Sequence, residues 1–93
     1  MEIPGKGILI VEYFAKWCGP CKLMHPITQK IDEDNDDVTL IKVDVDKQED
    51  LTANNDVKQV PTIHFYKDGV REFVNVGTMS EGAIEIQLKK LRI

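Results

Sequence analysis

The sequence predicts an α/β fold in which a mixed four-stranded sheet is flanked by about three helices. Two observations carry this prediction. In the first half of the chain, apolar β-branched runs alternate with helical patterns. In the second half, an Asp-Gly dipeptide at 68–69 joins two further strand-like runs in a hairpin pattern. Such an order combines parallel and antiparallel pairing in one sheet, and the 93 residues suit a single domain over 1–93.

The first strand is expected over residues 7–15, where a continuous apolar run leads into two aromatic residues. Because successive side chains in a strand point to opposite faces, one face carries Ile8, Ile10, Glu12 and Phe14.

The first helix is expected to begin within residues 18–20, because proline is favoured in the first turn of a helix. Four apolar residues follow at helical spacing: Leu23, Met24, Ile27 and Ile31. Pro26 lies inside this helix and removes a backbone donor, so a kink is expected there. The acidic residues 32–37 are expected to form a loop.

Two strands and a short helix are expected to follow the acidic residues. Val38–Asp44 and residues 61–67 have the β-branched and aromatic content of strands, and residues 47–54 between them predict a short polar helix. The Asp-Gly turn then leads into a fourth strand over Val70–Val76. Ser80 is a candidate N-cap for a last helix with one apolar stripe, formed by Ile84, Leu88 and Leu91.

Composition restricts the classes of function. The content of 42% apolar and 30% charged residues is typical of a soluble globular protein. The net charge of −4, without a basic stripe, argues against a nucleic-acid or anionic-membrane partner. No apolar run is long enough to span a bilayer, and the first residues lack the pattern of a secretion signal. We therefore expect a cytoplasmic protein, in which a cysteine pair is more often catalytic or metal-binding than structural.

The only two cysteines, Cys18 and Cys21, are separated by two residues and directly follow the first strand. A dithiol exchanges disulfides by thiolate attack, so one sulfur must be reachable and partly ionised. Cys18 lies where the helix begins, and the unpaired N–H groups there favour a negative charge. Gly19 and Pro20 hold both sulfurs within one short turn. The spacing therefore predicts Cys18 as the nucleophile and Cys21 as the resolving thiol.

Two other interpretations of the cysteines stay open, namely inert core thiols and a metal site. Cys18, Cys21 and His25 offer three potential ligands, whereas a structural zinc site normally has four. No second pair with ligand spacing exists in the sequence, so we expect no metal. Covalent haem attachment requires a histidine directly after the second cysteine, and Lys22 occupies that position.

From about Leu9 to its end, the chain resembles the thioredoxin family. The matching segments follow in the family's order and spacing: Trp17-Cys18-Gly19-Pro20-Cys21-Lys22, Pro26, Lys42, Val60-Pro61-Thr62, Phe65-Tyr66-Lys67-Asp68-Gly69 and Val76-Gly77. The resemblance implies a thioredoxin-like fold and a protein dithiol–disulfide oxidoreductase that carries electrons through a redox-active disulfide. It further implies protein substrates with disulfides, no bound cofactor, and recycling by a flavin-containing thioredoxin reductase that draws on NADPH.

The resemblance also assigns residues around the dithiol. Trp17 and the loop of Val60, Pro61 and Thr62 would flank the sulfurs and bind substrate backbone, and Gly77 would complete this surface. The family makes the Val60–Pro61 bond cis. Because proline offers no N–H, the loop leaves neighbouring backbone groups free to pair with an extended peptide.

The sequence departs from the family's pattern at two places. Glu12 stands where the family usually has a buried aspartate beneath the second cysteine. A buried carboxylate is costly to keep charged, which suits a proton acceptor for Cys21, although glutamate is one methylene longer. The alternative is a carboxylate that reaches solvent or pairs with Lys42, which matches the family's lysine partner of this acid.

The second departure is at the start, where only residues 1–6 precede the first strand instead of the family's extra strand and helix. We therefore expect Val38–Asp44 at a sheet edge, with reduced stability or self-association, as a monomer or weak dimer. Two function classes other than a disulfide reductase stay open: a non-enzymatic binding subunit and a metal-binding redox protein. A glutaredoxin-like role is disfavoured, because tryptophan and lysine flank the Cys-Gly-Pro-Cys loop.

Overall fold

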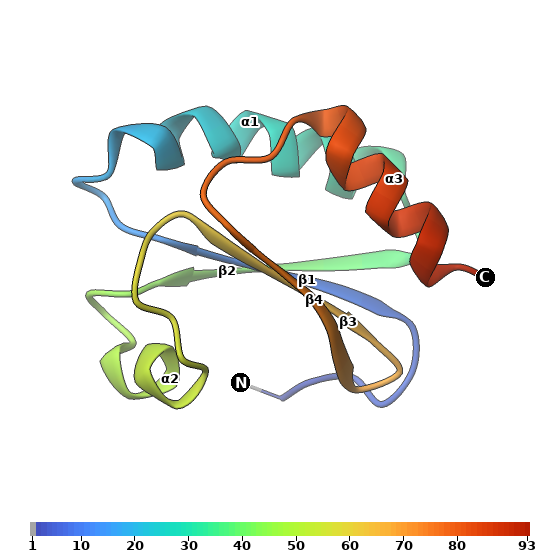
Figure 1. The fold of residues 1–93 in the computed structure, drawn as a ribbon, viewed down its shortest axis with the longest axis horizontal. Coiled ribbons are helices and arrows are strands. Elements are labelled where there is room, and N and C mark those ends of the chain that lie inside the picture. The colour runs from blue at the N-terminus through green and yellow to red at the C-terminus, as the bar shows by residue number, and fades with distance from the viewer. Residues whose placement is uncertain (1) are drawn as a thin grey trace.

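The computed structural model describes residues 2–93 and contains one mixed four-stranded sheet with three helices, as predicted (Figure 1). The elements follow in the order β1 (Ile8–Phe14), α1 (Gly19–Asp34), β2 (Val38–Asp44), α2 (Glu49–Asn54), β3 (Thr62–Lys67), β4 (Val70–Val76) and α3 (Glu81–Leu91). The strand order is β2-β1-β3-β4, so β2 and β4 are the outer strands of the described sheet. β1 pairs parallel with β2 and antiparallel with β3, and β4 pairs antiparallel with β3.

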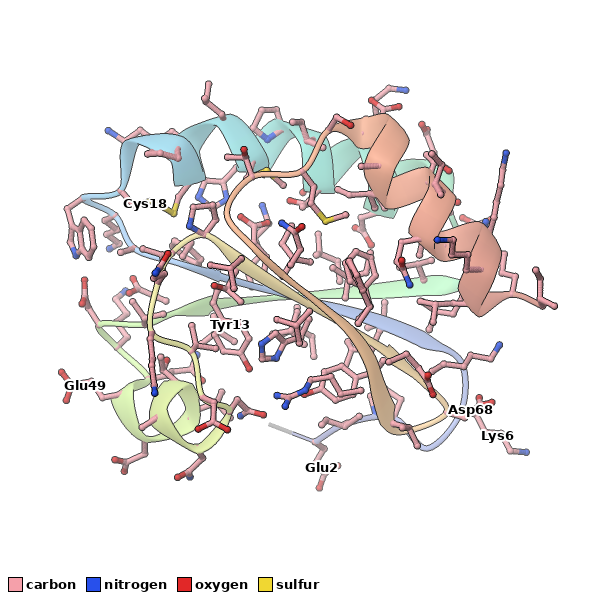
Figure 2. The ribbon with its side chains drawn as sticks, viewed as in Figure 1. Glu2, Lys6, Tyr13, Cys18, Glu49 and Asp68 are labelled. Carbon is pink, nitrogen blue, oxygen red and sulfur yellow. A yellow bond between two sulfur atoms is a disulfide. The ribbon has the colours of Figure 1, made fainter. Side chains whose placement is uncertain are left out.

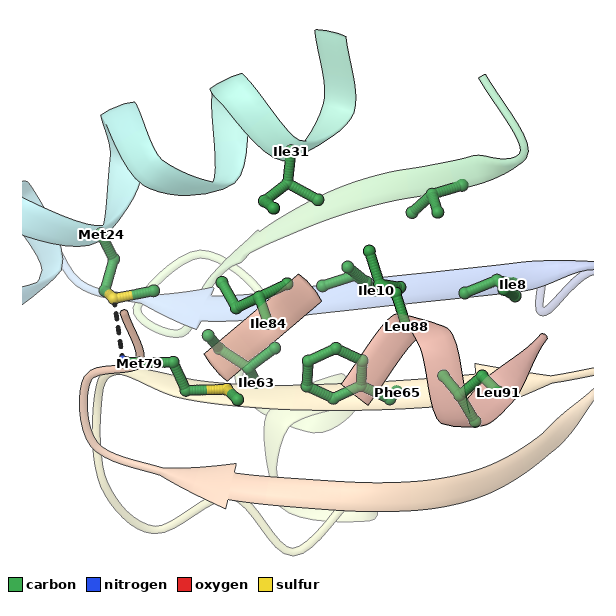
Figure 3. Close-up of a cluster of buried hydrophobic side chains, with 11 residues drawn as sticks. Ile8, Ile10, Met24, Ile31, Ile63, Phe65, Met79, Ile84, Leu88 and Leu91 are labelled. Atoms are coloured by element: carbon green, nitrogen blue, oxygen red, sulfur yellow. Dashed lines mark hydrogen bonds between the residues drawn. The ribbon is translucent and has the colours of Figure 1, made fainter. Parts of the chain in front are cut away.

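The main core lies between one face of the sheet and the two longer helices, α1 and α3 (Figures 1 and 3). Alternation along β1 and β3 directs every second side chain to this face. The helices contribute the stripes that their apolar spacing predicted. The fully buried members of this core are Ile10, Met24, Ile63, Phe65, Ile84 and Leu88. Leu23, in contrast, is on the outer side of α1 and is 67% exposed.

The opposite face carries a second cluster, with α2 lying on that side (Figure 1). Leu9, Val11 and Tyr13 of β1 pack there with Tyr66 of β3, and Leu51 of α2 packs against them. The N-terminal segment is tied to the hairpin between β3 and β4. There the Gly7 N–H donates to the side chain of Asp68 at 2.8 Å, and the Asp68 N–H donates to the Gly7 carbonyl at 2.9 Å.

Capping residues define the ends of the two longer helices, and the end of α1 differs from the prediction. Ser80 caps α3 as predicted, because its hydroxyl accepts the Ala83 N–H at 3.1 Å. The expected acidic loop over 32–37 is wrong in its first half, since α1 continues through Pro26 and ends at Asp34. Lys30 pairs with Asp34 one turn later, and the Asn35 side chain donates to the carbonyl of Ile31, so the helix is stabilised to this point.

The hairpin between β3 and β4 has the geometry that its Asp-Gly dipeptide predicted. Asp68 and Gly69 both have positive φ, 51° and 85°, as the tightest two-residue turns require. α2 is shorter than expected and begins at Glu49 rather than at residue 47. Within residues 2–93 no helix has the length and apolar character needed to cross a membrane.

His64 is enclosed within β3 on the face that carries Tyr13 and Tyr66. It is 2% exposed, and its ring centroid is 4.9 Å from that of Tyr13 and 6.5 Å from that of Tyr66. Burial lowers the pKa of His64 to about 4, and the positive charge of Arg71 acts in the same direction. Its Nδ1 has no hydrogen-bond partner among the described residues. The neutral ring is therefore the form that the fold accommodates.

The free energy of unfolding is expected to fall as the pH is lowered from about 6.5 to 4. In this window the unfolded chain protonates a histidine whose ordinary pKa is 6.5, whereas the folded chain does not do so until about pH 4. The contribution of His64 to the free energy of unfolding is fully present above the pKa that this histidine has in the unfolded chain. It is worth up to about 3 kcal/mol.

Urea unfolding at about pH 7 and at about pH 4.5, for the wild type and for His64→Gln, measures this contribution. Carboxylates titrate in both chains, so the difference between their pH dependences isolates the histidine. Equal pH dependence in the two chains would show that His64 does not carry the effect.

Candidate active site

Cys18 and Cys21 form a disulfide at the N-terminal end of α1, at the opposite end of that helix from the chain's C-terminus (Figures 1 and 2). Cys18 is the N-cap, and its sulfur accepts the Cys21 N–H at 3.2 Å. Gly19 and Pro20 form the first turn, where proline's missing N–H would in any case have no helical partner. After reduction, this backbone donor and the helix dipole favour a thiolate at Cys18.

The two cysteine residues differ slightly in exposure. Cys21 is completely buried, whereas Cys18 retains 4% exposure. Both pack with Ala15 in a small apolar cluster, against which Phe14 and Val60 also lie. A substrate sulfur therefore approaches the pair from the side of Cys18.

Trp17 stands beside this opening and is 72% exposed, which is unusual for a large aromatic side chain. Its indole Nε1–H donates to Oδ2 of Asp46 at 2.9 Å, which orients the ring. Between Trp17 and the loop before β3 is a groove of about 130 Å³ with a mainly apolar lining that includes Val45, Val57 and Val60.

The loop that precedes β3 lies against the dithiol cluster. The Val60–Pro61 peptide bond is cis, as the family resemblance implied, and Val60 packs on the cluster of the two cysteines. The Pro61 carbonyl accepts the N–H of Gly77 at 2.8 Å, and Gly77 has a φ of 99°, which favours glycine. Thr62 fixes the loop through its hydroxyl, which donates to the carbonyl of Gln59 at 2.6 Å. The structure thus brings this loop and Gly77 to one side of the disulfide.

Glu12 is completely buried on the face of β1 that α1 covers. The hydroxyl of Thr28 donates to its Oε1 at 2.5 Å, and Nδ1 of His25 lies 3.0 Å from its Oε2. The latter contact is within ion-pair distance, and Oε2 has no hydrogen-bond partner among the described residues. Of the sequence-based alternatives, a carboxylate head in contact with solvent is therefore wrong.

Lys42 lies opposite Glu12 in the register of β1 and β2, but it does not contact the acid directly. Its Nζ is 3.4 Å from Nδ1 of His25, and no Lys42–Glu12 ion pair forms within residues 2–93. The position of His25 explains this difference, because its Nδ1 is the shared neighbour of the two side chains. Lys42 therefore reaches the carboxylate only through the imidazole.

Sequence reasoning missed Thr28, Asp46 and the contact of His25 with Glu12. A signal existed for the first helix: Cys21, His25 and Thr28 follow at intervals of four and three residues and thus lie on one face. For Asp46 the sequence contained no comparable signal. Among the described residues no group of three or more His, Cys, Asp or Glu side chains is placed to hold a metal ion.

Comparison with known proteins gives a consistent result. A family model described as Thioredoxin matches residues 2–90. The chain is similar to a thioredoxin of Mycoplasmoides gallisepticum, with 32% identity over 81 residues that cover 87% of this chain and 81% of the relative. It is also similar to a thioredoxin of Gallus gallus, with 39% identity over 75 residues that cover 78% of this chain and 71% of the relative.

Solved structures show the same similarity in the fold. A mutant thioredoxin from Halobacterium salinarum superposes with a TM-score of 0.88 at 28% identity, covering 92% of this chain and 75% of that one. The oxidized form of mitochondrial thioredoxin 3 from Saccharomyces cerevisiae gives a TM-score of 0.83 at 33% identity, covering 91% of this chain and 79% of that one. Sequence and fold therefore agree over nearly the whole chain.

Proposed function

This chain belongs to the thioredoxin family and is a dithiol–disulfide oxidoreductase, and from this premise we propose that it reduces disulfides of proteins and is recycled by a thioredoxin reductase that draws on NADPH. The observation that carries the proposal is the Cys18–Cys21 disulfide at the start of α1, where Cys18 is the N-cap and retains 4% exposure and Cys21 is completely buried. The chain itself binds no cofactor in this proposal, because the cysteine pair holds the electrons.

In the proposed reaction, the Cys18 thiolate attacks one sulfur of a substrate disulfide. A Cys18–substrate bond forms, and the other substrate sulfur leaves as a thiolate. Cys21, deprotonated, then attacks the Cys18 sulfur, which closes the Cys18–Cys21 disulfide and releases the second substrate thiolate. Two electrons have passed to the substrate, and the reductase returns two electrons to the chain.

Substrate docking is proposed on the surface beside Cys18. An extended peptide would pair with backbone groups of the Pro61 loop, which packs against the cysteine cluster through Val60, as in recognition by strand addition. The groove beside Trp17 would accept an apolar side chain of that peptide, since its lining is mainly apolar. The exposed indole and Gly77 would border the peptide on either side of the dithiol.

Glu12 is proposed to accept the proton that Cys21 loses when it attacks. The support is geometric: Glu12 is buried under α1, and Thr28, which fixes its Oε1, lies on the same helix face as Cys21. Lys42 supports this carboxylate indirectly, through its contact with His25.

Glu12→Gln is expected to slow the attack of Cys21 on the mixed disulfide by about a hundredfold, at the lower end of what positioned proton transfer contributes. The attack of Cys18 on the substrate is expected to be unchanged, because that step does not use the acid. Stopped-flow measurement of the two steps, with a substrate disulfide that releases a chromophoric thiol, separates them. An unchanged rate for the second step would remove Glu12 from the mechanism.

The recycling partner and the compartment are part of the proposal. We place the chain in a reducing compartment, the cytoplasm, as a single-domain monomer or weak dimer. Oxidation of NADPH in the presence of a thioredoxin reductase, this chain and insulin tests the reductase. Turnover with dithiothreitol but none with NADPH and reductase would overturn the recycling route and leave disulfide reduction intact.

A further inference from the structure

We propose that His25 carries the proton between buried Glu12 and solvent, and that it acts on the reaction through Glu12 alone. This inference rests on the proposed role of Glu12 as the proton acceptor for Cys21. A carboxylate with no exposed surface can accept one proton, but it must lose that proton before the next cycle. His25 is the only side chain within ion-pair distance of Glu12 among residues 2–93.

The oxygen available to the proton is Oε2. Thr28 already donates its hydroxyl hydrogen to Oε1, and this hydroxyl also lies within hydrogen-bond distance of the carbonyls of Met24 and His25. Oε2 has no donor among the described residues and faces Nδ1 of His25 at 3.0 Å. A proton placed on Oε2 is therefore adjacent to an imidazole nitrogen that can take it.

Nδ1 of His25 has a second neighbour, which defines the other state of the ring. Nζ of Lys42 lies 3.4 Å away and donates to Nδ1 when that nitrogen carries no hydrogen. When Nδ1 is protonated, it pairs instead with Glu12. The charged groups that face this ring are Glu12 from β1 and Lys42 from β2.

The rest of the ring connects this site to water. The ring of Phe14 packs edge-on against it at a centroid distance of 4.9 Å, which holds the imidazole between the strand and the helix. The side chain of His25 is nevertheless 33% exposed, whereas Glu12 is completely buried. The imidazole therefore extends from the buried carboxylate to the surface.

As Cys21 attacks, the hydrogen of its thiol moves to Oε2 of Glu12, and the sulfur's electron pair forms the new bond to Cys18. Glu12 then gives the proton to Nδ1 of His25, which displaces the hydrogen bond from Lys42 and leaves an imidazolium beside a carboxylate. The imidazolium loses a proton to water from its other ring nitrogen, and proton exchange with water returns the neutral ring to the tautomer whose Nδ1 accepts from Lys42, so both groups recover their starting state.

The test uses His25→Ala, Glu12→Gln and the double variant, with the rate of repeated Cys21 attack measured in the full chain during continuous turnover, where Glu12 must lose its proton before each new attack. We expect His25→Ala to slow this step about tenfold, less than loss of the acceptor, because water can replace the imidazole inefficiently. Adding imidazole to the buffer should restore most of the rate. In the Glu12→Gln background, removing His25 should have no further effect, since the residue acts through the acid.

Lys30→Gln provides a matched control, because it removes a positive charge from an exposed part of the same helix. Its rate should equal that of the wild type. A normal rate in His25→Ala, a loss that imidazole does not rescue, or additive losses in the double variant would each overturn the relay. If Glu12→Gln is slow while His25→Ala is normal, the relay fails and the role of Glu12 stands. If the rate of Glu12→Gln is normal, the role of Glu12 as proton acceptor is wrong, and the relay that rests on it is wrong as well.

Discussion

Replacing Cys21 with serine is expected to trap the chain on its substrates as a stable mixed disulfide. Cys18 remains at the start of α1, where the helix favours its thiolate, so attack on a substrate disulfide proceeds. Without the second thiol, nothing inside the protein displaces the substrate. Turnover should fall at least about a thousandfold, the scale on which loss of an essential catalytic group acts. Non-reducing electrophoresis and mass spectrometry of the adduct measure the result.

Cys18→Ser provides the control for this trap. It leaves Cys21, which is completely buried and cannot reach a protein substrate, so neither turnover nor an adduct is expected. A Cys21-linked adduct in this variant would contradict the assignment of the two sulfurs. Equal trapping by both single variants would mean that their difference in exposure does not decide which one attacks.

Phe65→Ala is expected to cause the largest loss of stability among single substitutions in the core. Phe65 is completely buried in β3, between β1 and β4, and faces the core under α3 (Figure 3). Removing a buried phenylalanine costs about 3–5 kcal/mol through lost burial and the cavity that remains. The total free energy of unfolding of a natural domain is about 5–15 kcal/mol, so this variant should be only marginally stable.

Phe73→Ala is the matched control, because its ring contacts Phe65 at a centroid distance of 5.6 Å but is itself 36% exposed. Phe73→Ala should lower the free energy of unfolding by about 1 kcal/mol, the size typical of a single substitution. Urea unfolding of both variants at about pH 7 compares them. A loss in Phe65→Ala no larger than that in Phe73→Ala would show that the core is not centred on β3.

Much of the fold was accessible from the sequence because its elements have strong local signals. The apolar runs of β2 and β4 have the predicted bounds, and the Asp-Gly turn and the Ser80 cap have geometry that follows from their own chemistry. The end of α1 was less accessible. Acidic residues suggested a loop, but the pairing of Lys30 with Asp34 and the cap at Asn35 keep them helical.

For the candidate site, too, one part could be predicted from the sequence and another could not. The Cys-Gly-Pro-Cys motif is local and predicts its own position at a helix start. The surroundings depend on contacts between elements, which periodicity does not reveal. His25 meets Glu12 only because α1 packs across β1, and Trp17 is oriented by Asp46 only because β2 ends beside it. The length of the Glu12 side chain sets this site apart from the pattern that the family resemblance implied.

The most direct measurement is reduction of insulin disulfides by the chain with dithiothreitol as the electron donor. It follows the precipitation of the insulin B chain and needs no reductase, so it isolates the chemistry of Cys18 and Cys21. The wild type should accelerate precipitation well above dithiothreitol alone, and the double variant Cys18→Ser/Cys21→Ser should not. A folded wild-type chain with both thiols intact that gives no acceleration would contradict its assignment as a protein disulfide reductase.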